Sequence, residues 1–206
     1  MDAHAGSPPT AGELLRRHIQ GQNVQALGQY LHDWESWVAE LMESHLSYPV
    51  LCYFRSQHTN QSWLAALATI LDTCTLIIAY AEGGVRWQAK MTFAISRHAV
   101  VDLAEVLGAL PRARKIDRLP VEDLGKLRTF LTATGIPLRS SVEGDQKLDH
   151  LRQMYEPYIN TLSDRLLMPL PPWTLAKPMD NWRPSLSASF RDLPASRLPE
   201  MEEDKD

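Results

Sequence analysis

An apolar run with one acid inside it, residues 64–81 with Asp72, constrains the fold more than any other feature of this sequence. The run is about long enough to cross a bilayer, but an acid at the centre of a membrane costs roughly 2.5–3.5 kcal/mol on insertion scales. Small residues such as Ala65, Ala68 and Thr69 would let neighbouring helices approach closely. We therefore predict a central helix over residues 60–81, covered nearly all round by protein. A peripheral membrane protein that uses this run is the less favoured interpretation.

A buried acid at position 72 requires a partner, because an isolated buried charge is costly. The glycine pair Gly83–Gly84 predicts a turn that leads into an antiparallel helix over residues 85–110. Counting back from this turn places Asp72 near Arg97 and His98. We therefore expect a buried Asp72–Arg97 or Asp72–His98 pair, which is either a structural contact or a switch sensitive to pH or ligand. The inner face of this second helix is predicted from its apolar residues Trp87, Met91, Ala94, Ile95, Val101 and Leu107.

A heptad pattern marks another long helix, over residues 24–45. Its apolar positions recur at steps of three and four: Val24, Leu27, Leu31, Trp34, Val38, Leu41 and His45. This pattern is typical of one face of a helical bundle. The alternative is an oligomer seam formed by Leu27, Leu31, Trp34, Val38 and Leu41.

The remaining segments complete an all-α prediction, a helical bundle of about six helices over residues 11–173. Thr10 is the expected cap of a first helix, Pro120 the expected start of a fifth, and Pro157 a kink in a sixth that begins near Gln146. Residues 1–10 are expected to be a disordered lead. Residues 174–206 are expected to be a disordered, proline-rich tail, since half of the fourteen prolines lie from position 169 onward. We expect Trp173, just before that tail, to pack back on the bundle.

Composition narrows the classes of function. A net charge of -4 argues against nucleic-acid binding. The two cysteines lack zinc-ligand neighbours, and the first residues lack the pattern of a signal peptide. We therefore expect a cytoplasmic protein in a reducing compartment.

No catalytic motif is found: the sequence has no phosphate-binding loop, nucleophile elbow or His-Glu-x-x-His helix. We predict no catalytic residues, no cofactor and no metal, and thus no enzyme. His98 and Asp102 share a helix face, and with His45, Cys52 and His58 a metal site is conceivable, although a hydrogen-bonded core histidine is favoured. The alternative function is a small-molecule-binding module or an uncharacterised enzyme, with a pocket near residues 48–61 and 98. Its lining would be Tyr48, Arg55, His58, Gln61 and His98.

Three strings point to a family. The run SHLSYPVLCYFRSQHTNQSWLAALATILDTC resembles the C-terminal cytosolic helical domain of bacterial two-transmembrane, potassium-channel-type (ion channel family) proteins. The strings RHAVVDLAEVLG and LRQMYEPYINTLSDRLLMPLPPW are similar to that domain too, and together the three cover most of residues 14–173. This sequence departs from the family in its decisive part, because it contains neither paired membrane helices nor a TVGYG-like filter.

The resemblance implies a soluble cytosolic regulatory or assembly domain with no catalysis of its own. It implies a place in the cytoplasm, at the inner face of the plasma membrane when a pore is attached. Its partners would be further copies in a homo-oligomer and an upstream or separate membrane pore module, with membrane contact only through that partner. The resemblance supplies no catalytic residues and no ligand site.

Overall fold

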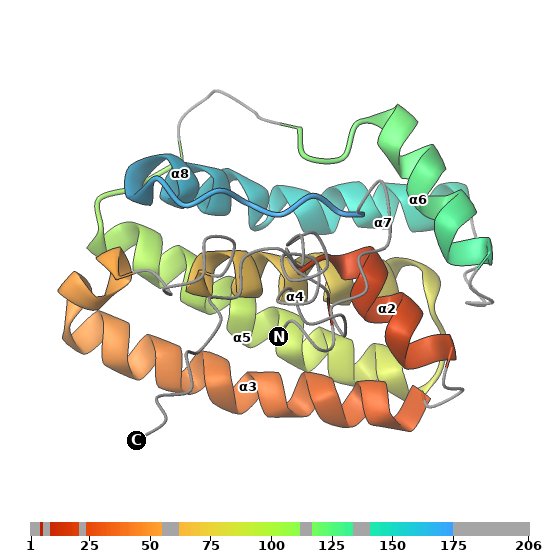
Figure 1. Ribbon diagram of the computed structural model, residues 1–206, viewed down its shortest axis with the longest axis horizontal. Helices are drawn as coiled ribbons and strands as arrows, with labels where there is room; N and C mark the ends of the chain where they lie inside the picture. The colour runs from red at the N-terminus through yellow and green to blue at the C-terminus, as the bar shows by residue number, and fades with distance from the viewer. Residues whose placement is uncertain are drawn as a thin grey trace, which may run out of the picture.

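The chain is all-helical in the part that the computed structural model describes, which is Ala5 and residues 9–20, 24–54, 62–111, 117–133 and 141–174. These residues form α2 (Ala11–Gln20), α3 (Val24–Ser47), the 3-10 helix η1 (Pro49–Tyr53), α4 (Trp63–Tyr80), α5 (Gly84–Val106), α6 (Val121–Ala133), α7 (Val142–Gln153) and α8 (Glu156–Leu166). Figure 1 shows α4 between two layers, with α3 and α5 on one side and α7 and α8 on the other. The predicted all-α bundle is confirmed.

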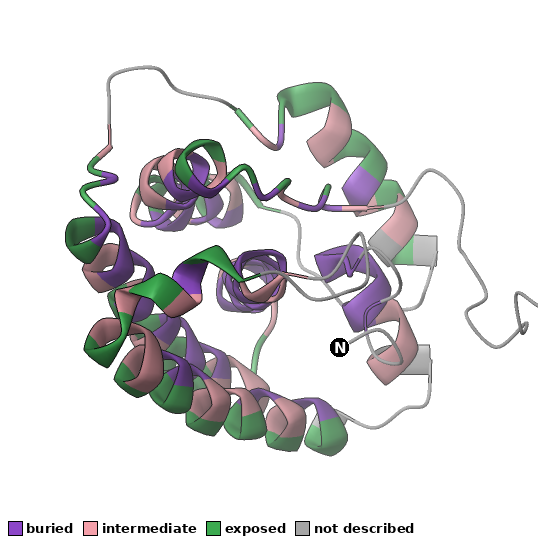
Figure 2. Ribbon diagram, turned by 60° about the vertical axis from the view of Figure 1, so that its left-hand side comes forward, coloured by how far each residue is buried: buried purple, intermediate pink, exposed green. Residues whose placement is uncertain are grey.

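The central helix is α4, as the apolar run predicts. Ser62 caps its first turn by accepting a hydrogen bond from the Ala65 amide at 3.0 Å. By length and a mean hydropathy of 1.7 it could cross a membrane, but 89% of it is buried inside the fold. Figure 2 shows this helix as buried on nearly every side. Its apolar surface is therefore already covered by the other helices of the chain.

The heptad face of α3 is used inside the chain. Leu27, Leu31, Val38 and Leu41 are buried in the core, where α3 packs along α5. Trp34 is half-buried and stacks edge-to-face on Trp37, with ring centroids 4.6 Å apart. An oligomer that used this seam would first have to separate α3 from α5, so the pattern is accounted for by the bundle.

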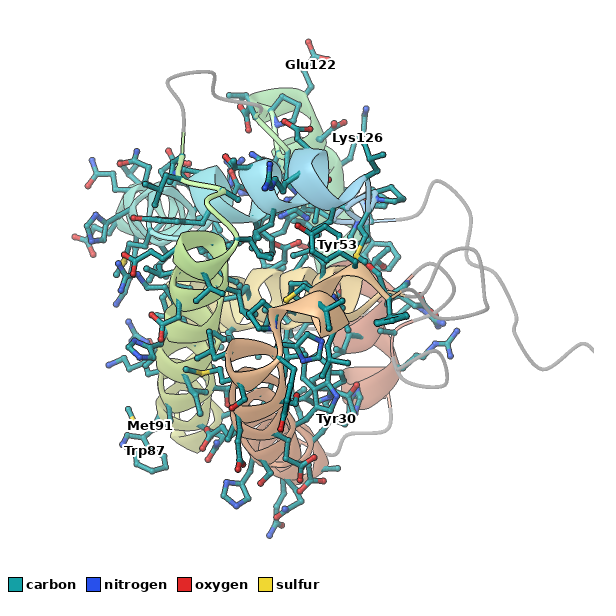
Figure 3. All side chains as sticks on the ribbon, turned by 90° about the vertical axis from the view of Figure 1, so that its left-hand side faces the viewer. Tyr30, Tyr53, Trp87, Met91, Glu122 and Lys126 are labelled. Carbon is teal, nitrogen blue, oxygen red and sulfur yellow. The ribbon has the colours of Figure 1, made fainter. Side chains whose placement is uncertain are left out.

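The inner face of α5 differs from the prediction. Gly83 supplies the expected turn with φ 86°, but the side chains of Trp87 and Met91 point away from the bundle and are exposed (Figure 3). The face toward α3 and α4 carries mostly small residues: Ala89, Thr92, Phe93, Ser96, Ala99, Val100, Leu103 and Ala104. Small residues let α5 approach both neighbours closely, and a count of bulky apolar residues cannot detect such a face.

The predicted sixth helix is two helices. It begins earlier than expected, at Val142 behind the cap Ser141, and it breaks after Gln153. Pro157 lies in the first turn of α8, where a proline needs no intrahelical donor. After α8 the chain turns at Leu167 and runs back over α8 and α7 as an extended segment (Figure 1). We call residues 168–174 the strap.

Packing extends beyond the predicted domain boundary at the N-terminus. Ala5, Pro9 and Thr10 are buried, and the Thr69 hydroxyl donates to the Pro9 carbonyl at 3.1 Å. Thr10 caps α2 as expected, since its hydroxyl accepts from the Glu13 amide at 3.2 Å. The rest of the predicted lead and the predicted tail beyond Thr174 lie outside the described residues.

Candidate functional site

The buried acid of α4 pairs with an arginine from a distant segment. The guanidinium of Arg118, which precedes α6, donates two hydrogen bonds to the Asp72 carboxylate, at 3.0 and 2.7 Å. The hydroxyl of Tyr155, at the break between α7 and α8, donates to the same carboxylate at 2.6 Å. The side chains of Asp72 and Arg118 are only 1% and 7% exposed, so this is a desolvated, two-point ion pair.

Neither predicted partner of Asp72 takes part in this contact, so that prediction is wrong. The Arg97 side chain donates to the Met154 carbonyl at 3.3 Å. His98 is 64% exposed and lies 3.1 Å from Asp102, four residues along the same helix. Counting along the hairpin considered only α5, whereas the partner comes from 46 residues further along the chain.

A second ion pair joins the first and reaches the surface. Arg152 on α7 donates to the Glu156 carboxylate at 3.0 and 3.1 Å, and to Asp117 at 2.5 Å. A guanidinium nitrogen of Arg118 lies 3.9 Å from a Glu156 oxygen. The Asp117 side chain is 60% exposed, whereas that of Glu156 is 10% exposed. A continuous line of charges therefore runs from solvent to the central helix. We call it the charged cluster: Asp72, Asp117, Arg118, Arg152, Tyr155 and Glu156.

The charged cluster also holds the strap. Arg118 donates to the Pro171 carbonyl at 3.0 Å. The guanidinium carbons of Arg118 and Arg152 lie over the Trp173 ring, 5.9 and 5.7 Å from its centroid. Trp173 is 2% exposed, and its carbonyl accepts from the Gly12 amide of α2 at 2.9 Å. The expected packing of Trp173 on the bundle is thus present, and it depends on two arginines of the cluster.

Burial and pairing shift the ionisation of the cluster in different directions. Burial raises the pKa of the Glu156 carboxyl, and the charge and hydrogen bonds of Arg152 offset this only in part. Burial alone would also raise the pKa of Asp117, but hydrogen bonds from Arg152 and from the Leu119 amide hold that pKa below its usual value. Burial, with the Asp72 charge second, raises the pKa of Tyr155 well above its usual value. The phenol therefore remains a donor to Asp72 at neutral pH.

The predicted small-molecule pocket is only partly visible. Arg55, His58 and Gln61 lie outside the described residues. Tyr48 is 67% exposed at the start of η1. His98 lines a hollow of about 520 Å³ on the outer side of α3 and α5, and the lining residues beside it are Ala39, Met42, Ala94 and Ile95. Tyr48 is not among the residues of that hollow, so the structure does not bring these two predicted residues together.

The two cysteines have no reactive surroundings. Cys52 and Cys74 are both buried, and burial raises the pKa of each thiol. In the described segments, no group of three or more histidine, cysteine or acidic side chains is placed to hold a metal ion. The His45 ring packs against Trp63 with centroids 5.6 Å apart, in an aromatic contact of the core.

Sequence reasoning missed most of the charged cluster. Arg152 and Glu156 are four residues apart, a spacing that favours ion pairs on a helix, yet they lie on either side of a helix break. Arg118 is the last arginine of the basic stretch PRARKIDRL, and no sequence feature of that stretch distinguishes this buried arginine from the others. The strongest sequence signal was Asp72 itself.

Comparison with known proteins adds no identification. No family profile, no curated protein and no solved structure matches this chain. The resemblance to potassium-channel-type proteins thus rests on the sequence strings alone.

Proposed function

We propose that this chain is a non-catalytic regulatory or assembly domain of the kind attached to bacterial potassium-channel-type pores, and that the charged cluster is its working part. The observation that carries the proposal is the path from exposed Asp117 through Arg152, Glu156 and Arg118 to buried Asp72. The same arginines hold the strap. A change of charge at one end of this path can therefore change whether a peripheral segment stays bound.

The free energy of a buried ion pair is better suited to a conformational switch than to a purely stabilising contact. A buried ion pair gives little net stability compared with apolar packing of the same volume, whereas removing one partner costs about 3–5 kcal/mol. Docking of the strap thus depends steeply on the state of a few groups. Residues expected to sense a signal are Asp117, which solvent reaches, and Glu156, whose pKa is raised by burial.

The test is to neutralise Asp72 and to follow the strap. The Gly12 amide donates to the Trp173 carbonyl, so its hydrogen exchange reports strap docking directly. In Asp72→Asn, we expect exchange at Gly12 to be at least roughly tenfold faster, with α3 and α5 still protected, because each 1.4 kcal/mol lost is tenfold in an equilibrium. Asp102→Asn, which removes only the half-exposed pair with His98, is the matched control and should leave Gly12 unchanged.

If Asp72→Asn does not fold, a double variant still tests whether the charged cluster holds the strap. Asp72→Asn with Arg118→Met removes both charges, so that none is left unpaired, and it still deletes the bond to Pro171 and the contact with Trp173. Unchanged exchange at Gly12 in the folded double variant would refute a role of the cluster in holding the strap. Light scattering of the full chain over a concentration series tests the assembly role, which a strict monomer at all concentrations would remove.

The small-molecule alternative has one supporting observation, the hollow beside His98. Its described lining is apolar apart from that histidine, so it lacks the converging polar groups that orient a ligand. We therefore place it second.

A further inference from the structure

The strap is bound mainly by groups outside the helix that it follows. Its polar contacts with the bundle come from Arg118, ahead of α6, and from the Gly12 amide of α2, and Arg152 of α7 lies over its tryptophan. Met168, at the start of the strap, is bonded to Ser163 of α8. An identical strap that arrives from another molecule could make every contact from Pro171 onward.

The connection between α8 and the strap is a single strained residue. Leu167 has φ 53° and ψ 38°, and it is the only non-glycine residue with positive φ in the described part of the chain. This left-handed conformation crowds the side chain of an L-residue, and proteins usually place glycine or asparagine there. Leu167 is 75% exposed, and hydrogen bonds from the Leu167 and Met168 amides to the Ser163 carbonyl, rather than packing of its side chain, hold it in this conformation. The strap folds back on its own chain through this left-handed turn.

We propose that the strap is exchanged between two copies of this chain, so that residues 168–174 of each copy dock on the charged cluster of the other. The exchange retains the contacts from Pro171 onward, requires the bonds between Met168 and Ser163 to be remade between the copies, and releases the left-handed turn at both hinges, which makes it a low-cost route to a dimer. This inference rests on the proposed function, because it names the element that performs the assembly role. It also replaces the heptad face of α3, which the core already uses.

The concentration at which exchange occurs can be estimated. A strap on a short connection has an effective concentration on the order of mM at its own site, and this favours the closed monomer. Release of one left-handed leucine changes the equilibrium by roughly tenfold, and a dimer releases two. The dissociation constant of the exchanged dimer is then on the order of 10 µM, within reach of purified protein.

A pair of cysteine variants detects the exchange. A Cβ added at Gly12 would lie 2.7 Å from the Thr174 methyl carbon, so the two positions are close enough for a disulfide after a small adjustment of α2 or the strap. Full-length Gly12→Cys and full-length Thr174→Cys are prepared separately, mixed at about 100 µM, well above the estimated constant, incubated and oxidised. A disulfide between position 12 of one chain and position 174 of another forms when the strap of one copy lies on α2 of the other.

We expect a 12–174 linked dimer in the mixture, identified by mass spectrometry of the joined peptides, and none in either variant alone. Leu167→Gly relieves the hinge strain in the closed form, so the linked fraction should fall by roughly tenfold or more at low micromolar protein. Leu110→Gly, which changes an exposed leucine away from the hinge, is the control and should leave that fraction unchanged.

Two results would overturn the exchange, and they bear differently on the proposed function. A chain that carries both Gly12→Cys and Thr174→Cys serves as a further control. If light scattering shows an oligomer, but position 12 links to position 174 only within this double variant and not between the two single variants, exchange is wrong while the assembly role stands. A chain that stays monomeric and unlinked at all concentrations removes both exchange and assembly. The coupling of Asp72 to strap docking is judged separately by hydrogen exchange at Gly12.

Discussion

Glu156 is an acid whose burial opposes its own ionisation. Its pKa is raised above 4.5, with burial as the main cause, while the pKa of Asp117 is lowered below 3.8 by Arg152 and the Leu119 amide. Both acids contact the same arginine, and they differ in exposure. Deep burial therefore leaves the pKa of Glu156 above its usual value, whereas the hydrogen bonds to the more exposed Asp117 leave its pKa below the usual value.

The two acids should affect the pH dependence of stability with opposite sign. A raised pKa means that the folded state binds the proton more tightly, so the contribution of Glu156 is complete below pH 4.5 and is lost as pH rises through its folded pKa. The lowered pKa of Asp117 means that its contribution is present above pH 3.8 and is lost as pH falls through its folded pKa.

We therefore expect the free energy of unfolding of Glu156→Gln to decline less than that of the native chain between pH 4.5 and neutrality. Asp117→Asn should remove a gain at the acid end of the profile instead. Urea unfolding at a series of pH values measures both. Equal pH profiles for Glu156→Gln and the native chain would show that the glutamate ionises as it does in water.

Of two glycines inside helices, Gly144 sets how closely α7 approaches α4 and Gly125 does not affect helix packing. A Cβ at Gly144 on α7 would lie 2.8 Å from the Tyr80 ring and 3.3 Å from the Ala79 carbonyl at the end of α4. A Cβ at Gly125, inside α6, would meet nothing within 4 Å. The same residue type therefore allows a helix contact at one position and only weakens a helix at the other.

Alanine at these two positions should change stability in opposite directions. Gly125→Ala should add about 0.5–1 kcal/mol, because alanine loses less conformational freedom in a helix. Gly144→Ala gains the same propensity but forces α7 from α4, and overpacking costs about 1–3 kcal/mol. Urea unfolding of both variants measures the difference. If both variants are stabilised, the contact between α7 and α4 is looser than the structure shows.

In this chain the sequence pattern predicted the positions of helices better than it predicted which side of each helix is buried. The cap at Thr10, the turn at Gly83 and the buried side of α3 follow from local rules that involve only neighbouring residues. The inner face of α5 escaped prediction because small residues form it. The pairing of Asp72 with Arg118 escaped it because tertiary packing brings together residues far apart in the sequence.

At the scale of the whole molecule, burial decides what the apolar helix can contact. α4 has the length and hydropathy of a membrane span, but 89% of it lies inside the fold, and Asp72 on it is bonded to Arg118 and Tyr155. To reach lipid, the chain would have to separate α4 from its neighbours and break these bonds. The cost would approach that of unfolding the domain, which is about 5–15 kcal/mol for typical proteins.

The folded full chain should therefore not use α4 to bind a bilayer. In flotation with vesicles of phosphatidylcholine and phosphatidylglycerol, we expect the native chain to remain in the dense fraction. A synthetic peptide that spans Trp63–Tyr80 should float, since its apolar surface is then uncovered. If the native chain floats, replacing exposed Trp87 and Met91 by serine tests whether that surface is responsible. If the variant still floats and α4 loses its protection from hydrogen exchange, the bundle opens on the membrane. The strap and the charged cluster would then be contacts that keep α4 covered in the absence of lipid.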